Sequence, residues 1–232
     1  MFYSDFGSFI HALLASYYTG AKSKSQIIGD YITNFRSMVL GRAPSQAIWA
    51  RFFNQGLTYL QAFEPFPEEI LGVERKIDFH IGDQRFTGFI DLLLKGDRGL
   101  VVLDHKSHDL KPRSQRTKPT RSDRELDEYL RQLYLYSAAI MQLYGAYPAE
   151  LVFNCYRTGV LIREPFSAAA CDEAQKWALD SISEIENQTS WRPNLDYYYC
   201  NYICDCHDEC EYYAIEFGQR KRRGRREGGD DQ

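Results

Sequence analysis

The chain has 232 residues, 44% of them hydrophobic, and a formal net charge of −4 at pH 7. A chain of this length and composition can bury a sizeable core, which excludes a wholly disordered protein. Because the net charge is negative, nucleic-acid binding would depend on local basic patches. The first residues lack the pattern of a secretory leader, and no apolar run approaches about 18 residues, so we expect a soluble cytoplasmic protein with no membrane partner.

The first quarter of the chain is predicted to be helical. Apolar residues recur at helical spacing over 7–18, and further helices are expected over 26–40 and 44–63. His11 lies in the first of these helices. On sequence alone, a histidine at such a position is more often a packed or surface residue than a metal ligand.

A run of three strands follows, over 73–81, 84–94 and 100–103, with turn residues between them. Their alternation of apolar and polar residues is typical of an antiparallel meander. Glu74 lies in the first strand and faces away from Val73, which by default makes it a solvated residue.

Charged side chains interrupt the second and third strands. Asp91 lies inside an almost wholly apolar run, and Asp104 and Lys106 follow Leu-Val-Val-Leu at alternate positions, so they share a face. Burying charge is costly unless the charge is paired or binds a metal. The simpler explanation of these charges is a structural ion pair. The other explanation is that Asp91 and Asp104 hold a hard divalent cation while Lys106 orients water or offsets negative charge.

The segment 107–123 is basic and almost without apolar residues, which predicts a flexible loop suited to a polyanion; Lys111 and Arg113 are its first two basic residues. A long amphipathic helix is expected over 125–144, with Gln132 and Tyr136 on one face. A hairpin over 151–162 and a helix over 167–187 complete the pattern. The sequence thus predicts an α/β fold with a mixed central β-sheet flanked by helices, and a helical N-terminal part.

Four cysteines lie close together near the end of the chain, at Cys200, Cys204, Cys206 and Cys210. In a reducing compartment such a group indicates zinc or an iron-sulfur cluster more than disulfides. We expect three parts: a core over 1–190, a Cys-rich segment over 191–218 that packs on the core, and a basic, disordered tail over 219–232.

The order of these motifs resembles the RecB-like branch of the PD-(D/E)xK nucleases. The resemblance rests on His11, Gly88-x-x-Asp91, Asp104-x-Lys106 and Gln132-x-x-x-Tyr136, and it covers most of the chain. It implies a restriction-endonuclease-like core whose metal is bound by His11, Asp91, Asp104 and the backbone carbonyl of His105. Lys106 would be the catalytic lysine, and Gln132 and Tyr136 would contact DNA. Glu74 falls near an acidic position of the family and is a secondary metal candidate.

The same resemblance implies a [4Fe-4S] cluster on Cys200, Cys204 and Cys210, with a fourth cysteine ahead of the core. This chain has no cysteine before Cys155. Three explanations stay open: Cys206 replaces the missing ligand, the start of the sequence is truncated or misassigned, or the site is a local zinc site. The spacing of Cys204 and Cys206 is tight for two ligands of one metal.

The predicted function is a metal-dependent DNA nuclease using Mg²⁺ or Mn²⁺, acting as an exonuclease on single strands or duplex ends. The alternatives are an accessory nucleic-acid-binding or assembly protein, and a site-specific endonuclease. The candidate partners are DNA, proteins of recombination or of CRISPR adaptation, and a second copy of the chain. The expected location is the cytoplasm of a prokaryote or of a virus-infected host.

Overall fold

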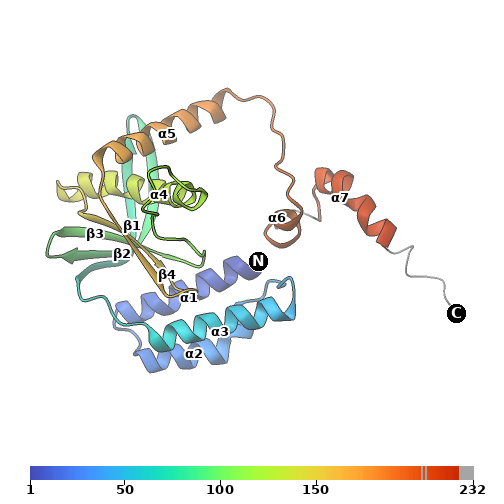
Figure 1. Ribbon diagram of the computed structural model, residues 1–232, viewed down its shortest axis with the longest axis horizontal. Coiled ribbons are helices and arrows are strands. Elements are labelled where there is room, and N and C mark those ends of the chain that lie inside the picture. The colour runs from blue at the N-terminus through green and yellow to red at the C-terminus, as the bar shows by residue number, and fades with distance from the viewer. Residues whose placement is uncertain (205, 207, 225–232) are drawn as a thin grey trace.

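The computed structural model describes residues 1–204, 206 and 208–224, with side chains described up to residue 217. A single sheet runs through the middle of the body, with helices above and below it (Figure 1). In the described part of the chain, no helix combines the length and the apolar character that a membrane span requires.

The sheet has five strands in the order β1-β2-β3-β4-β5. β3 and β4 are parallel, and every other neighbouring pair is antiparallel, so the predicted mixed sheet is confirmed. The parallel pair requires a crossover, which helix α4 (Arg121–Tyr144) supplies. The strand bounds are β1 (Glu69–Ile81), β2 (Gln84–Gly96), β3 (Gly99–Lys106), β4 (Glu150–Cys155) and β5 (Val160–Pro165).

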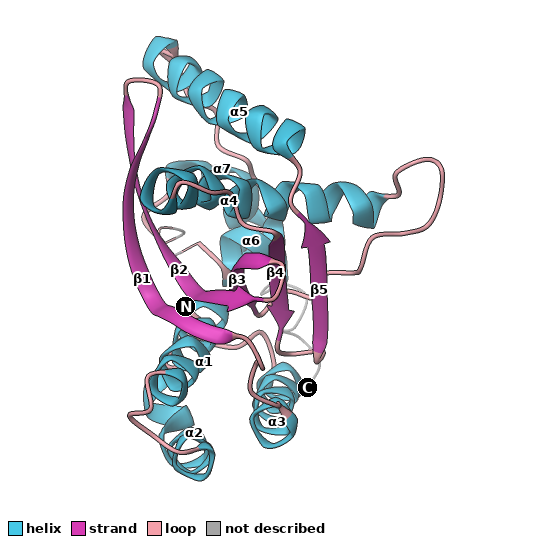
Figure 2. Ribbon diagram, turned by 90° about the vertical axis from the view of Figure 1, so that its left-hand side faces the viewer, coloured by secondary structure: helices cyan, strands magenta, loops and turns pink. Residues whose placement is uncertain are grey.

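Helices cover both faces of the sheet (Figure 2). α4 and α5 (Ala168–Asn187) cover one face, where aliphatic side chains dominate the core. The other face carries the predicted helical N-terminal part, whose core is rich in aromatic rings. Its helices are α1 (Phe2–Tyr18), α2 (Lys24–Met38) and α3 (Gln46–Ala62). Both faces of the central strands are therefore buried, which explains their nearly continuous apolar sequence.

Helix α4 begins four residues earlier than the apolar spacing predicts. Thr120 and Asp123 form a capping box, in which each side chain accepts a hydrogen bond from the other residue's backbone N–H. Asp123 also accepts hydrogen bonds from the backbone and side chain of Ser114, at 2.7 and 2.6 Å. Leu110 is buried in the core at 1% exposure. The loop 107–120 is thus tied to the body at several points, where the sequence predicts a flexible excursion.

The ladder between β2 and β3 ends before either strand does. It runs from Gly96↔Gly99 to Leu92↔Leu103, while β2 continues beside β1 and β3 continues beside β4 as far as Lys106. β3 is accordingly longer than the predicted 100–103. Asp91 and Asp104 are the next residues along the two strands, so they lie where the strands part.

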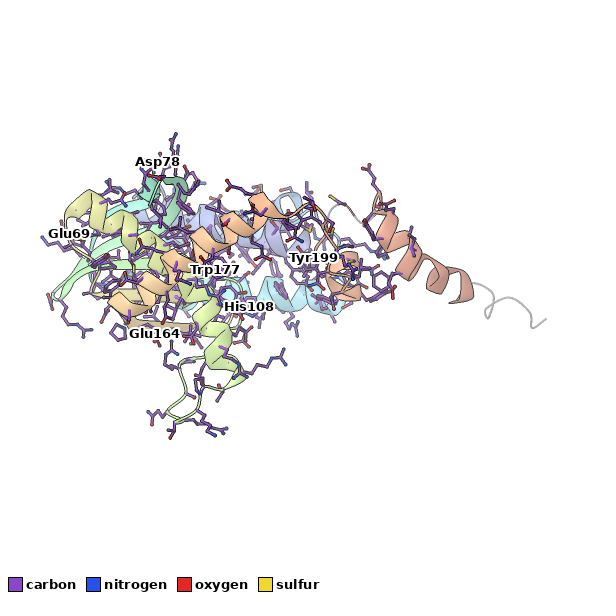
Figure 3. All side chains as sticks on the ribbon, turned by 90° about the horizontal axis from the view of Figure 1, so that it is seen from above. Glu69, Asp78, His108, Glu164, Trp177 and Tyr199 are labelled. Atoms are coloured by element: carbon purple, nitrogen blue, oxygen red, sulfur yellow. The ribbon has the colours of Figure 1, made fainter. Side chains whose placement is uncertain are left out.

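The C-terminal segment forms two further helices, α6 (Tyr197–Tyr202) and α7 (Glu211–Gly224), which the sequence pattern does not predict. In Figure 3 the segment with Tyr199 lies toward the side from which α7 extends, far from Glu69 at the start of β1. A hydrogen bond between the hydroxyls of Tyr3 and Tyr198 joins α6 to α1. The segment predicted as a basic tail starts within α7, and its last part, 225–232, lies outside the described residues.

Candidate metal and active site

Three side chains that could ligate a metal ion, each from a different element, meet where β2 and β3 separate. They are His11 on α1, Glu74 on β1 and Asp91 on β2, and their ligand atoms lie within 4.8 Å of one another. His11 Nδ1 is 3.5 Å from Asp91 Oδ2 and 3.8 Å from Glu74 Oε1. In the described part of the chain, no other three acidic, histidine or cysteine side chains form such a group. A pocket of about 620 Å³ opens here, lined by Tyr3, Ser4, Gly7, Ser8, His11, Ala12, Glu74 and Ser107.

Asp91 is the buried member of this group, His11 is half-buried and Glu74 is exposed. Burial acts to raise the pKa of Asp91, but the hydrogen bond and positive charge of His11 outweigh it and hold that pKa below its usual value. Burial likewise acts to lower the pKa of His11, yet Asp91 and Glu74 raise it to about 10. At neutral pH the imidazole therefore carries a proton, which a cation must displace.

Asp104 lies on the opposite face of the sheet from His105, beside Lys106. The Lys106 Nζ is 2.9 Å from Asp104 Oδ2, although no hydrogen bond is aligned on that buried oxygen. Burial raises the pKa of Asp104 to about 6, against the lowering effect of the Lys106 charge. A buried carboxylate oxygen without a hydrogen bond, beside a second buried carboxylate, is a donor set that fits a hard divalent cation.

Lys106 is held from α4 by the two residues of the Q-x-x-x-Y motif. Its Nζ donates to Gln132 Oε1 at 2.9 Å, and Gln132 Nε2 donates to the Tyr136 hydroxyl at 2.9 Å. The ring of Tyr136 packs onto the backbone of Gly88, where a Cβ atom would lie 2.6 Å from Tyr136 Cε1. The glycine of G-x-x-D is therefore needed because the tyrosine that supports Gln132 occupies the space of a side chain.

The model of the PD-(D/E)XK nuclease superfamily matches residues 2–211 of the sequence. The chain belongs to this superfamily. No curated protein matches the chain. A crystal structure from Eubacterium rectale, described as that of a candidate exonuclease, is similar to this chain. The match covers 85% of this chain and 80% of the other, with 13% sequence identity and a TM-score of 0.43.

The middle residue of D-x-K in this superfamily member is His105, whose ring is buried and neutral. Burial lowers the pKa of His105 to about 3. Asn154 Nδ2 lies 2.9 Å from His105 Nδ1 and also donates to the Tyr59 hydroxyl at 2.5 Å, while Tyr18 stacks on the ring. Asn154 interrupts the otherwise apolar residues 151–155 of β4, and such an interruption is a sequence signal for a buried polar contact.

The backbone of His105 touches two candidate ligands at once. Its N–H donates to Asp91 Oδ2 at 2.6 Å, and its carbonyl lies 2.8 Å from His11 Nε2, which donates to it. The predicted metal-binding carbonyl thus lies beside the trio, on the far side of the imidazole from Asp91. Ligation by this carbonyl stays a prediction.

Glu74 has an unusual backbone conformation, with φ of +45°. It stands opposite Asp91, between the ladder pairs Val73↔Leu92 and Arg75↔Ile90. The left-handed region costs a non-glycine residue roughly 1–2 kcal/mol, and such strain clusters at functional sites. Glu74 thus combines a strained backbone with a position beside His11 and Asp91, and its role as a metal ligand stays a prediction.

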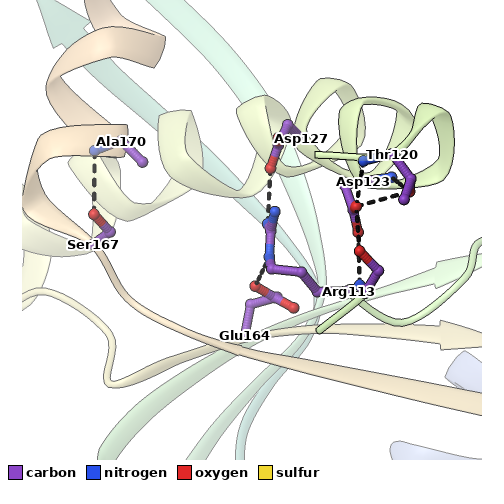
Figure 4. Close-up of polar contacts among 8 residues, drawn as sticks. Arg113, Thr120, Asp123, Asp127, Glu164, Ser167 and Ala170 are labelled. Carbon is purple, nitrogen blue, oxygen red and sulfur yellow. Dashed lines mark hydrogen bonds and ion pairs between the residues drawn. The ribbon is translucent and has the colours of Figure 1, made fainter. Parts of the chain in front are cut away.

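Arg113 and Lys111, predicted to contact substrate, are engaged by carboxylates. Arg113 bridges Asp127 at 2.7 Å and Glu164 at 2.9 Å, which joins the loop to α4 and β5 (Figure 4). The hydrogen bonds with the two carboxylates raise the pKa of Arg113 above its usual value. Lys111 Nζ donates to Asp109 at 2.9 Å. These contacts give Arg113 a structural role, and the substrate assignment of both residues stays a prediction.

Cys155, Cys171, Cys200, Cys206 and Cys210 are free thiols. Cys200 is buried and packs with Cys210, Tyr213 and Phe217 in a small cluster of α6 and α7. Cys204 is half-buried and Cys206 is exposed. Within the described residues these thiols do not form a group as tight as the trio around His11. The cluster ligands predicted from the sequence stay a prediction.

Proposed function

We propose that this superfamily member is a divalent-metal-dependent deoxyribonuclease that hydrolyses phosphodiester bonds. The observation that carries the proposal is the meeting of His11, Glu74 and Asp91 beside a buried Asp104 and Lys106. Separate acidic and basic groups converge here from α1, β1, β2 and β3, at the edge of a pocket of about 620 Å³. A structural ion pair would require only Asp104 and Lys106, and would leave the trio unexplained.

The residues present fit a hard cation. His11, Glu74 and Asp91, whose ligand atoms already lie together, would hold it, with Asp104 and the His105 carbonyl as the further donors expected from the sequence. Oxygen ligands suit Mg²⁺, and the one imidazole makes Mn²⁺ an equally good occupant. When bound, such a cation polarises a phosphoryl oxygen and lowers the pKa of a water molecule.

Lys106 supplies the positive charge of the protein itself. Its ammonium group donates to Gln132 Oε1 and lies beside Asp104, so two of its N–H directions are fixed. The remaining direction can orient a water molecule or offset the negative charge that develops on the phosphate. Tyr136 fixes the Gln132 amide, and Gly88 provides the space for Tyr136. The motif residues of α4 therefore act by aiming Lys106.

The second part of the proposal is that the enzyme is an exonuclease that requires a DNA end. Labelled linear and circular single-stranded DNA, incubated separately with Mg²⁺ or Mn²⁺, test both parts. Loss of the linear strand with the circle intact supports an exonuclease. Cutting of the circular strand would indicate an endonuclease in place of an exonuclease. Absence of cleavage of both substrates would favour an accessory DNA-binding protein.

For the Cys-rich segment we propose a [4Fe-4S] cluster on Cys200, Cys204 and Cys210 with Cys206 as fourth ligand, and zinc as the alternative. What supports it is the spacing of the thiols and the packing of Cys200 against Cys210. Iron and sulfide with a brown colour after anaerobic purification would support the cluster. Zinc without iron would replace it. Recombination or CRISPR-adaptation proteins are the partners we propose for the assembled enzyme.

A further inference from the structure

Two arginines share one aromatic ring at the edge of the helical layer. The guanidinium carbons of Arg51 and Arg157 lie 5.9 and 4.2 Å from the centre of the Phe52 ring. Arg51 and Phe52 belong to α3, whereas Arg157 lies in the turn between β4 and β5, which Figure 2 shows beside α3. Residues more than 100 positions apart in the sequence thus bring two positive charges together over an apolar surface.

Neither guanidinium has a carboxylate within ion-pair distance among the described residues. The Arg157 Nε is buried and makes no hydrogen bond. Burial and the like charge of Arg51 lower the pKa of Arg157 and outweigh the more distant negative charge of Asp109, which acts to raise it. By contrast, Arg113 and Arg163 each bridge two carboxylates. A buried unpaired N–H and two like charges held together are costly, and an anion would relieve both costs.

Tyr3 links the arginine pair to the pocket of the proposed active site, although neither arginine lines that pocket itself. The charges of Arg51 and Arg157 both act on the hydroxyl of Tyr3. Tyr3 packs edge-on against Phe52 and lines the same pocket as His11 and Glu74. A strand that enters this pocket and extends along α1 would therefore bring its phosphates to the two guanidinium groups.

We propose that Arg51 and Arg157 form a phosphate subsite that holds the nucleic-acid strand beside the metal-binding trio. The proposal rests on the proposed nuclease function and names residues that none of the family motifs contains. Guanidinium groups match phosphate oxygens in charge and geometry, and phosphate oxygens accept hydrogen bonds from the unpaired Arg157 N–H. The trio and Lys106 then act on one phosphate while the arginine pair holds another part of the strand.

Binding measured without cleavage tests this subsite. A fluorescent single-stranded oligonucleotide is titrated in EDTA over a series of salt concentrations, with wild type and the double variant Arg51→Gln/Arg157→Gln. We expect the double variant to bind at least roughly tenfold more weakly. The slope of log affinity against log salt should fall by about 1.4, since each phosphate contact to a single strand contributes about 0.7.

Arg36→Gln is the matched control, because Arg36 lies 5.5 Å from the centre of the Trp49 ring in the same helical layer, whereas the arginine pair lies over the Phe52 ring. The single variant Arg51→Gln removes an exposed side chain and guards against misfolding of the double variant. The proposal is overturned if both Arg51→Gln and the double variant keep the affinity and salt slope of Arg36→Gln. Because the assay excludes cleavage, its outcome is independent of whether the metal site is active.

Matched oligonucleotides with a terminal phosphate or a terminal hydroxyl show whether the subsite binds a terminal or an internal phosphate. Tighter binding of the phosphorylated strand, lost in the double variant, assigns the subsite to a strand end. Equal binding of the two strands, with the weakening still present in the double variant, assigns it to an internal phosphodiester. Both results support a phosphate subsite.

Discussion

The backbone N–H of His105 donates a 2.6 Å hydrogen bond to Oδ2 of Asp91. The ladder between β2 and β3 has just ended at Leu92↔Leu103, so a β2 side chain replaces the β2 backbone as partner of this N–H. The same carboxylate faces His11 at 3.5 Å. The fork in the sheet and the candidate metal site are thus built by one set of contacts.

Asn154 should support this fork through the ring of His105. The substitution Asn154→Ala removes the side-chain amide that forms hydrogen bonds with the buried His105 Nδ1 and with the Tyr59 hydroxyl. We expect a stability loss of about 1–3 kcal/mol and a 10- to 100-fold weaker Mn²⁺ affinity. Thermal unfolding and Mn²⁺ titration followed by electron paramagnetic resonance measure the two effects. Asn187→Ala, at the exposed end of α5, is the control. Unchanged Mn²⁺ affinity in the Asn154 variant would contradict the positioning role.

Glu74 should show a trade-off between stability and metal binding. Because its φ is +45°, Glu74→Gly relieves backbone strain and should be about 1 kcal/mol more stable than Glu74→Gln in the metal-free state, while both weaken Mn²⁺ binding. Glu74→Gln keeps the strain and removes the charge, so it should weaken binding without the gain in stability. Chemical denaturation in EDTA compares them. A glycine variant less stable than the glutamine variant would show that the strain does not govern this position.

Gly88→Ala should disturb the support of Lys106 from a distance. The added methyl group would lie 2.6 Å from Tyr136 Cε1, so the ring must move and Gln132 loses its hydroxyl partner. We expect a loss of about 1–3 kcal/mol in stability and slower DNA cleavage. Adding Tyr136→Ala should restore stability and leave cleavage slow. As a control, Gly29→Ala in α2 meets no atom within 4 Å and should stabilise by about 0.5–1 kcal/mol. Full activity in Gly88→Ala would refute the chain of support.

Metal binding should release a proton from His11. Its pKa of about 10 in the metal-free protein lies above the ordinary 6.5, because Asp91 and Glu74 outweigh burial. Mn²⁺ affinity should therefore rise by up to about tenfold per pH unit between roughly pH 7 and 9. Calorimetry in buffers of different ionisation enthalpy measures the released proton, which His11→Gln should abolish. Release that is unchanged in the variant would assign the proton to another group.

The same raised pKa determines how the metal-free protein responds to pH. Charged His11 contributes stability that is fully present below about pH 6.5 and is lost as the pH rises toward 10. The melting temperature in EDTA should thus fall from pH 7 to 10 more steeply for wild type than for His11→Gln. Parallel curves for the two proteins would contradict the assignment.

Much of this arrangement follows from sequence patterns that have local causes. Alternation along β3 places Asp104 and Lys106 on one face of the sheet. Helical spacing places Gln132 and Tyr136 on one face of α4. Apolar spacing predicts the start of α4 four residues too late, whereas the capping signal of Thr120 and Asp123 marks the true start.

Other features depend on contacts between distant segments and have no local pattern. The left-handed Glu74 arises where β1 passes the fork, and Arg51 and Arg157 meet only after α3 packs beside the β4–β5 turn. Arg113 could be recognised as basic, but its two carboxylate partners come from α4 and β5. The positive charge of the loop can be read from the sequence, whereas the carboxylates that engage Arg113 become visible only in the fold.

The most direct test of the central claim is cleavage of end-labelled linear DNA in Mn²⁺ by wild type, Lys106→Ala and Lys95→Ala. Lys95 is exposed near the far end of β2, 3.9 Å from Glu69, and serves as the matched lysine. We predict metal-dependent cleavage by wild type and Lys95→Ala, and a rate at least roughly 100-fold lower in Lys106→Ala. Cleavage that persists undiminished in Lys106→Ala, or that proceeds in EDTA, would contradict the proposed mechanism.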